Sequence, residues 1–148
     1  MALIEREAAG DVNARDEEGR SPLHRACVGG DMVKVLALIE EEADMNVVDS
    51  IGLTSLHVAC VNGHLEVAMA LIDRGADINA RDNSGSTSLH LACLNGRLEV
   101  AMALIDRGAY MNAVENMRYT PLHVACVSGR LEVAMALIDR GADMNAED

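Results

Sequence analysis

The chain has 148 residues, of which 50% are hydrophobic and 24% charged, so it is long enough and apolar enough to fold around one packed core. Its formal net charge of −12 argues against binding of nucleic acid, which requires a basic surface. No apolar run is long enough for a membrane span, and Glu5, Arg6, Glu7 and Asp11 interrupt the first 15 residues, where a signal peptide needs an apolar stretch.

One segment of sequence recurs four times with a period of 33 residues. The stretch LEVAMALIDRGA is identical at 65–76, 98–109 and 131–142. The period is marked most clearly by His24, His57, His90 and His123 and by Cys27, Cys60, Cys93 and Cys126. It divides the chain into units 16–48, 49–81, 82–114 and 115–148, preceded by 1–15, which looks like part of a unit. Units of this length stack and bury their apolar faces only against their neighbours.

Within one unit the sequence predicts two helices and a loop. Apolar residues at helical spacing predict a short helix over 55–62, with Thr54 as its N-cap and Gly63 at its end. A second helix begins near Leu65 and stops at Asp73-Arg74-Gly75, where glycine can take the left-handed conformation. The loop that follows contains Asp82-Asn83-Ser84-Gly85, which is typical of a β-turn.

The start of each short helix resembles the T-P-L-H-x-A opening of ankyrin repeats, a family with this 33-residue period. The four openings are Ser21-Pro22-Leu23-His24, Thr54-Ser55-Leu56-His57, Thr87-Ser88-Leu89-His90 and Thr120-Pro121-Leu122-His123. The resemblance covers 16–148 in full and 1–15 in part. It implies an all-α ankyrin-repeat solenoid of antiparallel helix pairs with protruding hairpin-like loops. It also implies that each histidine is hydrogen-bonded to the loop opening its own helix and to the neighbouring unit.

Two units depart from this pattern. The first has Glu40-Glu41-Glu42-Ala43 in place of Asp-Arg-Gly-Ala, so we expect its second helix to end differently. The fourth has Glu115-Asn116-Met117-Arg118 without the turn glycine, so the resemblance does not fix its turn geometry. The last unit is as apolar as the interior ones, which indicates a fragment of a longer array.

The repeated His-x-x-Cys pairs are the most enzyme-like feature, yet they do not predict a metal or catalytic site. Stacked helices lie about 8–10 Å apart, whereas ligands of one zinc ion must lie within about 4 Å of each other. The same separation excludes disulfides within the chain, and four free thiols favour a reducing compartment, the cytoplasm or nucleus. We therefore expect no enzyme, no cofactor and no metal.

The positions that vary between otherwise copied units are the candidate binding residues, because stacking fixes the rest. In ankyrin-repeat proteins the loop tips and the exposed side of the first helix line a concave groove. The candidate partner-binding residues are Glu17, Glu18, Arg20, Val28, Ile51, Leu53, Val61, Asn62, Asn83, Ser86, Leu94, Asn95, Met117, Arg118, Tyr119 and Val127. The alternative is that the aliphatic members pack between adjacent first helices and only border solvent.

The sequence thus favours a protein–protein interaction module that binds a partner protein or an extended peptide. Residues 1–48 carry 11 acidic and 5 basic side chains, which makes a partner with a basic segment an additional hypothesis. We expect a monomer that binds neither nucleic acid nor membrane. The competing interpretation is an architectural spacer or self-associating segment of a longer array, in which end-to-end association continues the stack.

Overall fold

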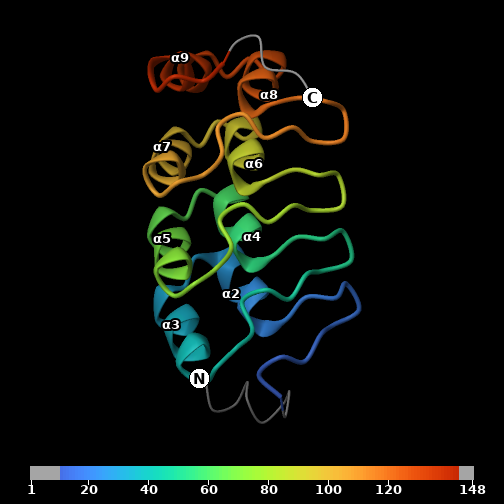
Figure 1. The fold of residues 1–148 in the computed structure, drawn as a ribbon. Coiled ribbons are helices and arrows are strands. Elements are labelled where there is room, and N and C mark those ends of the chain that lie inside the picture. Colours follow the sequence, from blue (N-terminus) through green and yellow to red (C-terminus); the bar gives the residue numbers. More distant parts are fainter. Residues whose placement is uncertain (1–10, 144–148) are drawn as a thin grey trace.

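The computed structural model of the protein describes residues 11–143, and within that range it contains eight helices and no strand. The helices form antiparallel pairs that stack along one axis, and a loop projects from the stack before each later pair (Figure 1). This confirms the predicted all-α solenoid, while most of the predicted partial repeat 1–15 lies outside the described residues. The helices are α2 (Pro22–Gly29), α3 (Met32–Glu40), α4 (Ser55–Val61), α5 (Leu65–Asp73), α6 (Ser88–Leu94), α7 (Leu98–Asp106), α8 (Pro121–Val127) and α9 (Leu131–Asp139).

The first helix of each pair begins with a reciprocal exchange of hydrogen bonds. The hydroxyl of Thr54 accepts the backbone N–H of His57, while Nδ1 of His57 accepts the N–H of Thr54 at 2.9 Å. The exchange satisfies N–H groups that a helix start leaves without partners. It confirms the predicted N-cap at Thr54 and recurs at Ser21–His24, Thr87–His90 and Thr120–His123.

The second helix of each pair ends in the left-handed region of the backbone. After α5, Gly75 has a φ of 105°, as predicted, and the N–H of Ala76 donates to the carbonyl of Leu71. The prediction that α3 ends differently from the other second helices is wrong. α3 stops in the same register because Glu42 takes the place of glycine with a φ of 67°. A non-glycine residue there costs about 1–2 kcal/mol, so the surrounding packing must offset that cost.

The core runs through the stack as columns of small and aliphatic side chains. Leu23, Leu56 and Leu89 of the first helices are buried, and each is followed by a buried cysteine one helical turn further on. Leu71, Leu104 and Leu137 form the matching buried column in the second helices. Because first helices contact first helices and second helices contact second helices, each pair covers the apolar side of the next.

The projecting loops close in tight turns. The N–H of Gly85 donates to the carbonyl of Asp82 at 2.9 Å, which confirms the predicted β-turn. The loop before α8 has the same turn without glycine, since the N–H of Arg118 donates to the carbonyl of Glu115 at 2.8 Å and Arg118 takes a φ of 72°. The geometry that the sequence left open is therefore that of the other turns.

Backbone hydrogen bonds link the loop tips into a ladder that runs along the stack. The three rungs are Ser50 N–H to Glu18 O, Asn83 N–H to Ile51 O and Asn116 N–H to Ser84 O, at 2.9, 3.1 and 2.9 Å. Gly52 is required beside this ladder, because a Cβ at that position would come within 2.4 Å of Oδ1 of Asn83. The tips therefore hold one another in register along the stack.

Candidate functional site

The candidate binding residues lie on the projecting loops and on the first helices, and we call the surface between these elements the inner face (Figure 1). The exposed members are Glu17, Glu18, Val28, Ile51, Asn83, Leu94, Met117, Arg118, Tyr119 and Val127. The half-buried members are Arg20, Leu53, Val61, Asn62, Ser86 and Asn95. The ladder uses backbone groups at the tips, and the amide of Asn83 adds a side-chain hydrogen bond to the Ser50 carbonyl at 3.3 Å.

Four aliphatic side chains occupy equivalent places near the ends of the first helices. Val28, Leu94 and Val127 are 42%, 45% and 70% exposed, whereas Val61 is half-buried. The alternative that these side chains pack between adjacent first helices therefore fits Val61, but it does not fit Val28, Leu94 and Val127. Apolar side chains this exposed and aligned along a stack are typical of interaction surfaces.

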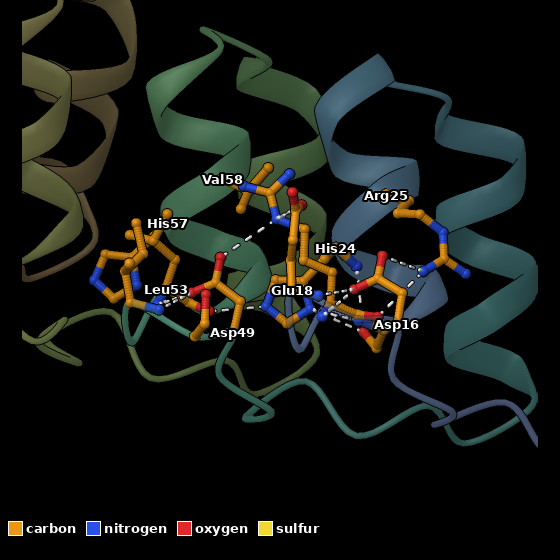
Figure 2. A network of polar contacts seen from close by, with 12 residues as sticks. Asp16, Glu18, His24, Arg25, Asp49, Leu53, His57 and Val58 are labelled. Atoms are coloured by element: carbon orange, nitrogen blue, oxygen red, sulfur yellow. Dashed lines mark hydrogen bonds and ion pairs between the residues drawn. The ribbon is translucent and has the colours of Figure 1, made fainter.

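A carboxylate at the base of each loop holds the loop shape. Oδ1 of Asp49 accepts the N–H groups of Ile51 and Leu53 at 3.0 and 2.9 Å, and Nε of Arg20 lies 3.4 Å from Oδ2 (Figure 2). The Asp49 side chain is only 2% exposed, so these donors compensate its removal from water.

The same arrangement recurs at Asp16 in the preceding loop. Oδ1 of Asp16 accepts the N–H groups of Glu18 and Arg20, and its Oδ2 pairs with Nη1 of Arg25 at 3.1 Å (Figure 2). The hydrogen bond from the Arg20 N–H is the largest cause of the lowered pKa of Asp16. Arg25 therefore anchors this loop by an ion pair, at a position where the other pairs carry an apolar residue.

A hollow of about 180 Å³ opens on the inner face between α6, α8 and the loop that precedes α8. Leu91, Leu94, Val124 and Val127 line it together with the Tyr119 ring, and its polar members are Ser86, His90, Glu115 and Ser128. Four of the candidate residues meet at this hollow, namely Ser86, Leu94, Tyr119 and Val127. The structure thus brings together residues that belong to two helix pairs and two loops.

Some candidate residues also have a role within the fold. The amide groups of Asn62 and Asn95 donate to the carbonyls of Val58 and Leu91 at 2.9 and 2.8 Å, so they cap their own helices. The Leu53 carbonyl accepts from Nε2 of His24, and its side chain packs on the core. Substitutions at Asn62, Asn95 or Leu53 would therefore change the stability of the fold as well as the binding surface.

The repeated histidines connect adjacent pairs, as the resemblance implied. Nε2 of His24 lies 2.8 Å from the Leu53 carbonyl, and Nε2 of His90 lies 2.9 Å from the Tyr119 carbonyl. Because backbone N–H groups donate to Nδ1, each ring carries its proton on Nε2 and is neutral. Burial lowers the pKa of both rings, and also that of His57, whose Nε2 lies 3.0 Å from the Ala80 carbonyl.

The candidate set from the sequence omits other side chains that line the hollow. Glu115 stands where the preceding units have aspartate, and this longer carboxylate was the available signal. Leu91 and Val124, equivalent to each other in the repeat, were not among the candidate residues, yet both reach the hollow. Ser128 follows Val127 at the end of α8 and completes its edge.

The residues at 11–143 hold no group of three or more histidine, cysteine or acidic side chains placed to bind a metal ion. Among them, no helix is both long enough and apolar enough to cross a membrane. The four cysteines are free thiols, with Cys27, Cys60 and Cys93 buried and Cys126 exposed.

The comparison with curated proteins finds no match. A family model described as ankyrin repeats in three copies matches residues 2–82 and 80–148. Such repeats generally serve as protein–protein interaction modules that carry no enzymatic activity. With helix pairs, capping boxes and histidine links recurring at the family's period over nearly the whole length, the chain belongs to the ankyrin-repeat family.

Proposed function

We propose that the chain is an interaction module that binds a partner protein or an extended peptide on its inner face. The observation that carries this proposal is the row of exposed aliphatic residues Val28, Leu94 and Val127. The core of the stack is complete without these side chains, since buried leucine and cysteine columns already join the helix pairs. Their exposure to water is unfavourable by about 25 cal/mol per Å² of apolar surface, and a partner that covers them removes that cost.

The test compares two surface residues of nearly equal exposure. Val127 on α8 is 70% exposed and borders the hollow, whereas Leu131 at the start of α9 is 74% exposed and lies outside it. The full chain carrying Val127→Glu should capture at least about tenfold less of its cellular partner than the unmodified chain. Capture is measured by affinity purification with quantitative mass spectrometry.

The control variant is Leu131→Glu, which adds the same charge outside the inner face and should leave capture unchanged. Both variants should keep the thermal midpoint of the unmodified chain, because neither side chain is in the core. Equal losses in both variants, or no loss in Val127→Glu, would contradict the proposal.

The partner that we propose carries a basic segment and meets the protein inside the cell. Support comes from the net charge of −12 and from the exposed Glu17 and Glu18 at the first loop tip. The four free thiols support a reducing compartment. Binding should weaken as salt is added, because at 0.1 M ionic strength the attraction between exposed charges more than about 10 Å apart is largely screened.

A second candidate function is self-association along the stack. The specific observation is Met135 of α9, which is 56% exposed, whereas the equivalent Met69 and Met102 are half-buried and pack on the core. Sedimentation velocity distinguishes the two functions. A size that grows with concentration and is reduced by Met135→Glu supports self-association, and a constant monomer size excludes it.

A further inference from the structure

The hollow on the inner face has an apolar wall and an acidic edge. Leu94 and Val127 form the wall together with the ring of Tyr119, and Glu115 lines the hollow from the loop side. This combination suits a long side chain that is aliphatic along its length and positively charged at its end. The inference below rests on the proposed function and specifies what the inner face recognises.

The protein itself shows how a cation sits at such a loop. At Asp49, one carboxylate oxygen accepts two loop N–H groups, and the other oxygen faces Nε of Arg20 at 3.4 Å. Arg20 lies 29 residues before Asp49 and belongs to the preceding loop. A guanidinium from a neighbouring loop therefore pairs with the carboxylate oxygen that the loop N–H groups do not use.

At the hollow the place of Arg20 is taken by a serine, and the nearby Arg81 donates to the backbone carbonyls of Gly85 and Val114. Oε1 of Glu115 accepts the N–H groups of Met117 and Tyr119 at 2.6 and 3.0 Å, which matches the role of Oδ1 in Asp49. The residue equivalent to Arg20 is Ser86, whose short side chain does not fill the space and instead lines the hollow. Both of these hydrogen bonds are made to Oε1, so neither loop N–H group uses Oε2 of Glu115.

We propose that the hollow binds an arginine side chain of the partner, which takes the place that Arg20 occupies beside Asp49. The methylene stem lies against Leu94 and Val127, and the guanidinium donates to Oε2 of Glu115 next to the Tyr119 ring. Arginine fits better than lysine, because its planar guanidinium both pairs with a carboxylate and stacks on an aromatic ring. The net charge of −12 attracts a basic peptide to this surface.

The first experiment uses a minimal probe of this chemistry. N-acetyl-arginine amide is titrated into the full chain with ¹³C-labelled methyl groups, and the methyl signals of Leu94, Val124 and Val127 are followed by NMR. N-acetyl-citrulline amide, neutral and nearly the same shape, is the matched ligand. The arginine amide should shift these signals and bind about tenfold more tightly than the citrulline amide, as expected for a charge-assisted hydrogen bond.

Two variants locate the effect. Glu115→Gln keeps an oxygen for both loop N–H groups but removes the charge, so it should abolish the preference for arginine over citrulline. Glu99→Gln, which removes an exposed carboxylate from α7, should leave the preference unchanged. Ser86→Arg supplies the cation from within the chain, as Arg20 does at Asp49, and should prevent the arginine amide from shifting the methyl signals.

Three results would overturn the arginine proposal: equal binding of the two amides, tighter binding of N-acetyl-norleucine amide than of the arginine amide, or no shift of the three methyl signals at millimolar probe concentrations. These outcomes are distinguishable from failure of the proposed function. If Val127→Glu still loses capture of the partner, the inner face binds a partner and only its recognition of arginine is refuted.

Discussion

At the scale of single residues, the second and third repeats carry serine where the first and fourth carry proline. Ser55 is the first residue of α4, and its buried hydroxyl has no hydrogen-bond partner of good geometry. It lies beside the Cys27 thiol, which is a weak partner. Pro121 occupies the equivalent position in α8, and Thr120 before it has nearly the same φ and ψ as Thr54.

Ser55→Pro should therefore stabilise the protein by about 1 kcal/mol. The change removes an unsatisfied buried hydroxyl and restricts the unfolded chain, at a helix position where the N–H is not needed. Urea unfolding measures the gain. Ser55→Ala separates the two contributions, since it removes only the hydroxyl, and a fall in stability for Ser55→Pro would show that the backbone does not accept proline there.

The residue scale also shows why the sequence predicts the wrong outcome at one turn, at Glu42, and leaves a second turn open, at Arg118. The sequence indicates where glycine is missing, at Glu42 and Arg118, but the left-handed backbone at these positions is imposed by the packed pairs on either side. The preference for glycine in the left-handed region amounts to about 1–2 kcal/mol per residue. The free energy gained by stacking a whole helix pair is larger, so it can hold another residue in that conformation.

At the scale of elements, His24, His57 and His90 join their short helices to the loop that follows in the next repeat. Their neutral rings accept at Nδ1 and donate at Nε2, so a second proton would place a donor opposite the N–H of Ser21 or Thr87. Burial is the first cause that lowers the pKa of His24, His57 and His90 below the ordinary 6.5. In the unfolded chain the same rings take up protons at about their ordinary pKa.

Stability should consequently be highest above pH 6.5 and should fall as the pH decreases below it. In that range the unfolded state binds more protons than the folded state, so each of the three rings adds a slope of up to about 1.4 kcal/mol per pH unit. Urea unfolding between pH 7.5 and 5 measures the slope, in a range where most carboxylates stay charged. His90→Gln should reduce the slope by about one proton, and a flat profile would refute the prediction.

The elements themselves were the most predictable part of the fold. Identical 33-residue spacing and a capping residue before each short helix placed α4 and α5 within about one residue of their observed bounds. The hollow was not predictable in the same way, because Ser86, Glu115 and Val127 meet only through the stacking of two pairs. Variation between repeats identified Ser86 and Val127 as candidates, whereas the place of Glu115 at the hollow became clear only from the packing of the structure.

At the scale of the whole molecule, each helix pair contains one free cysteine, whose reaction rate can measure how often that pair opens. Burial raises the pKa of the thiols of Cys27, Cys60 and Cys93 to about 12, and Cys126 is exposed. A thiol reacts through its thiolate, so the buried three react only when their pairs open.

A disulfide reagent at neutral pH should therefore modify one thiol quickly and three at least about 100-fold more slowly. Mass spectrometry of labelled peptides identifies the sites, and Cys126→Ser should remove the fast phase. Similar rates for the three slow thiols would show that the stack opens as one cooperative body, whereas four equally fast thiols would contradict the buried column.

The ladder of backbone hydrogen bonds between loop tips has a consequence for engineering new specificities. The rungs use main-chain groups of Ser50, Asn83 and Asn116, so the exposed side chains of Ile51 and Met117 can be diversified without disturbing loop spacing. Asn83 and Asn116 must be kept, because their amides also donate to the Ser50 and Asn83 carbonyls at 3.3 and 3.2 Å. Gly52 and Gly85 must stay fixed, since an added methyl at either would collide with the adjacent tip. A randomised library built on this scaffold would thus vary the chemistry presented at each tip while keeping the geometry of display constant.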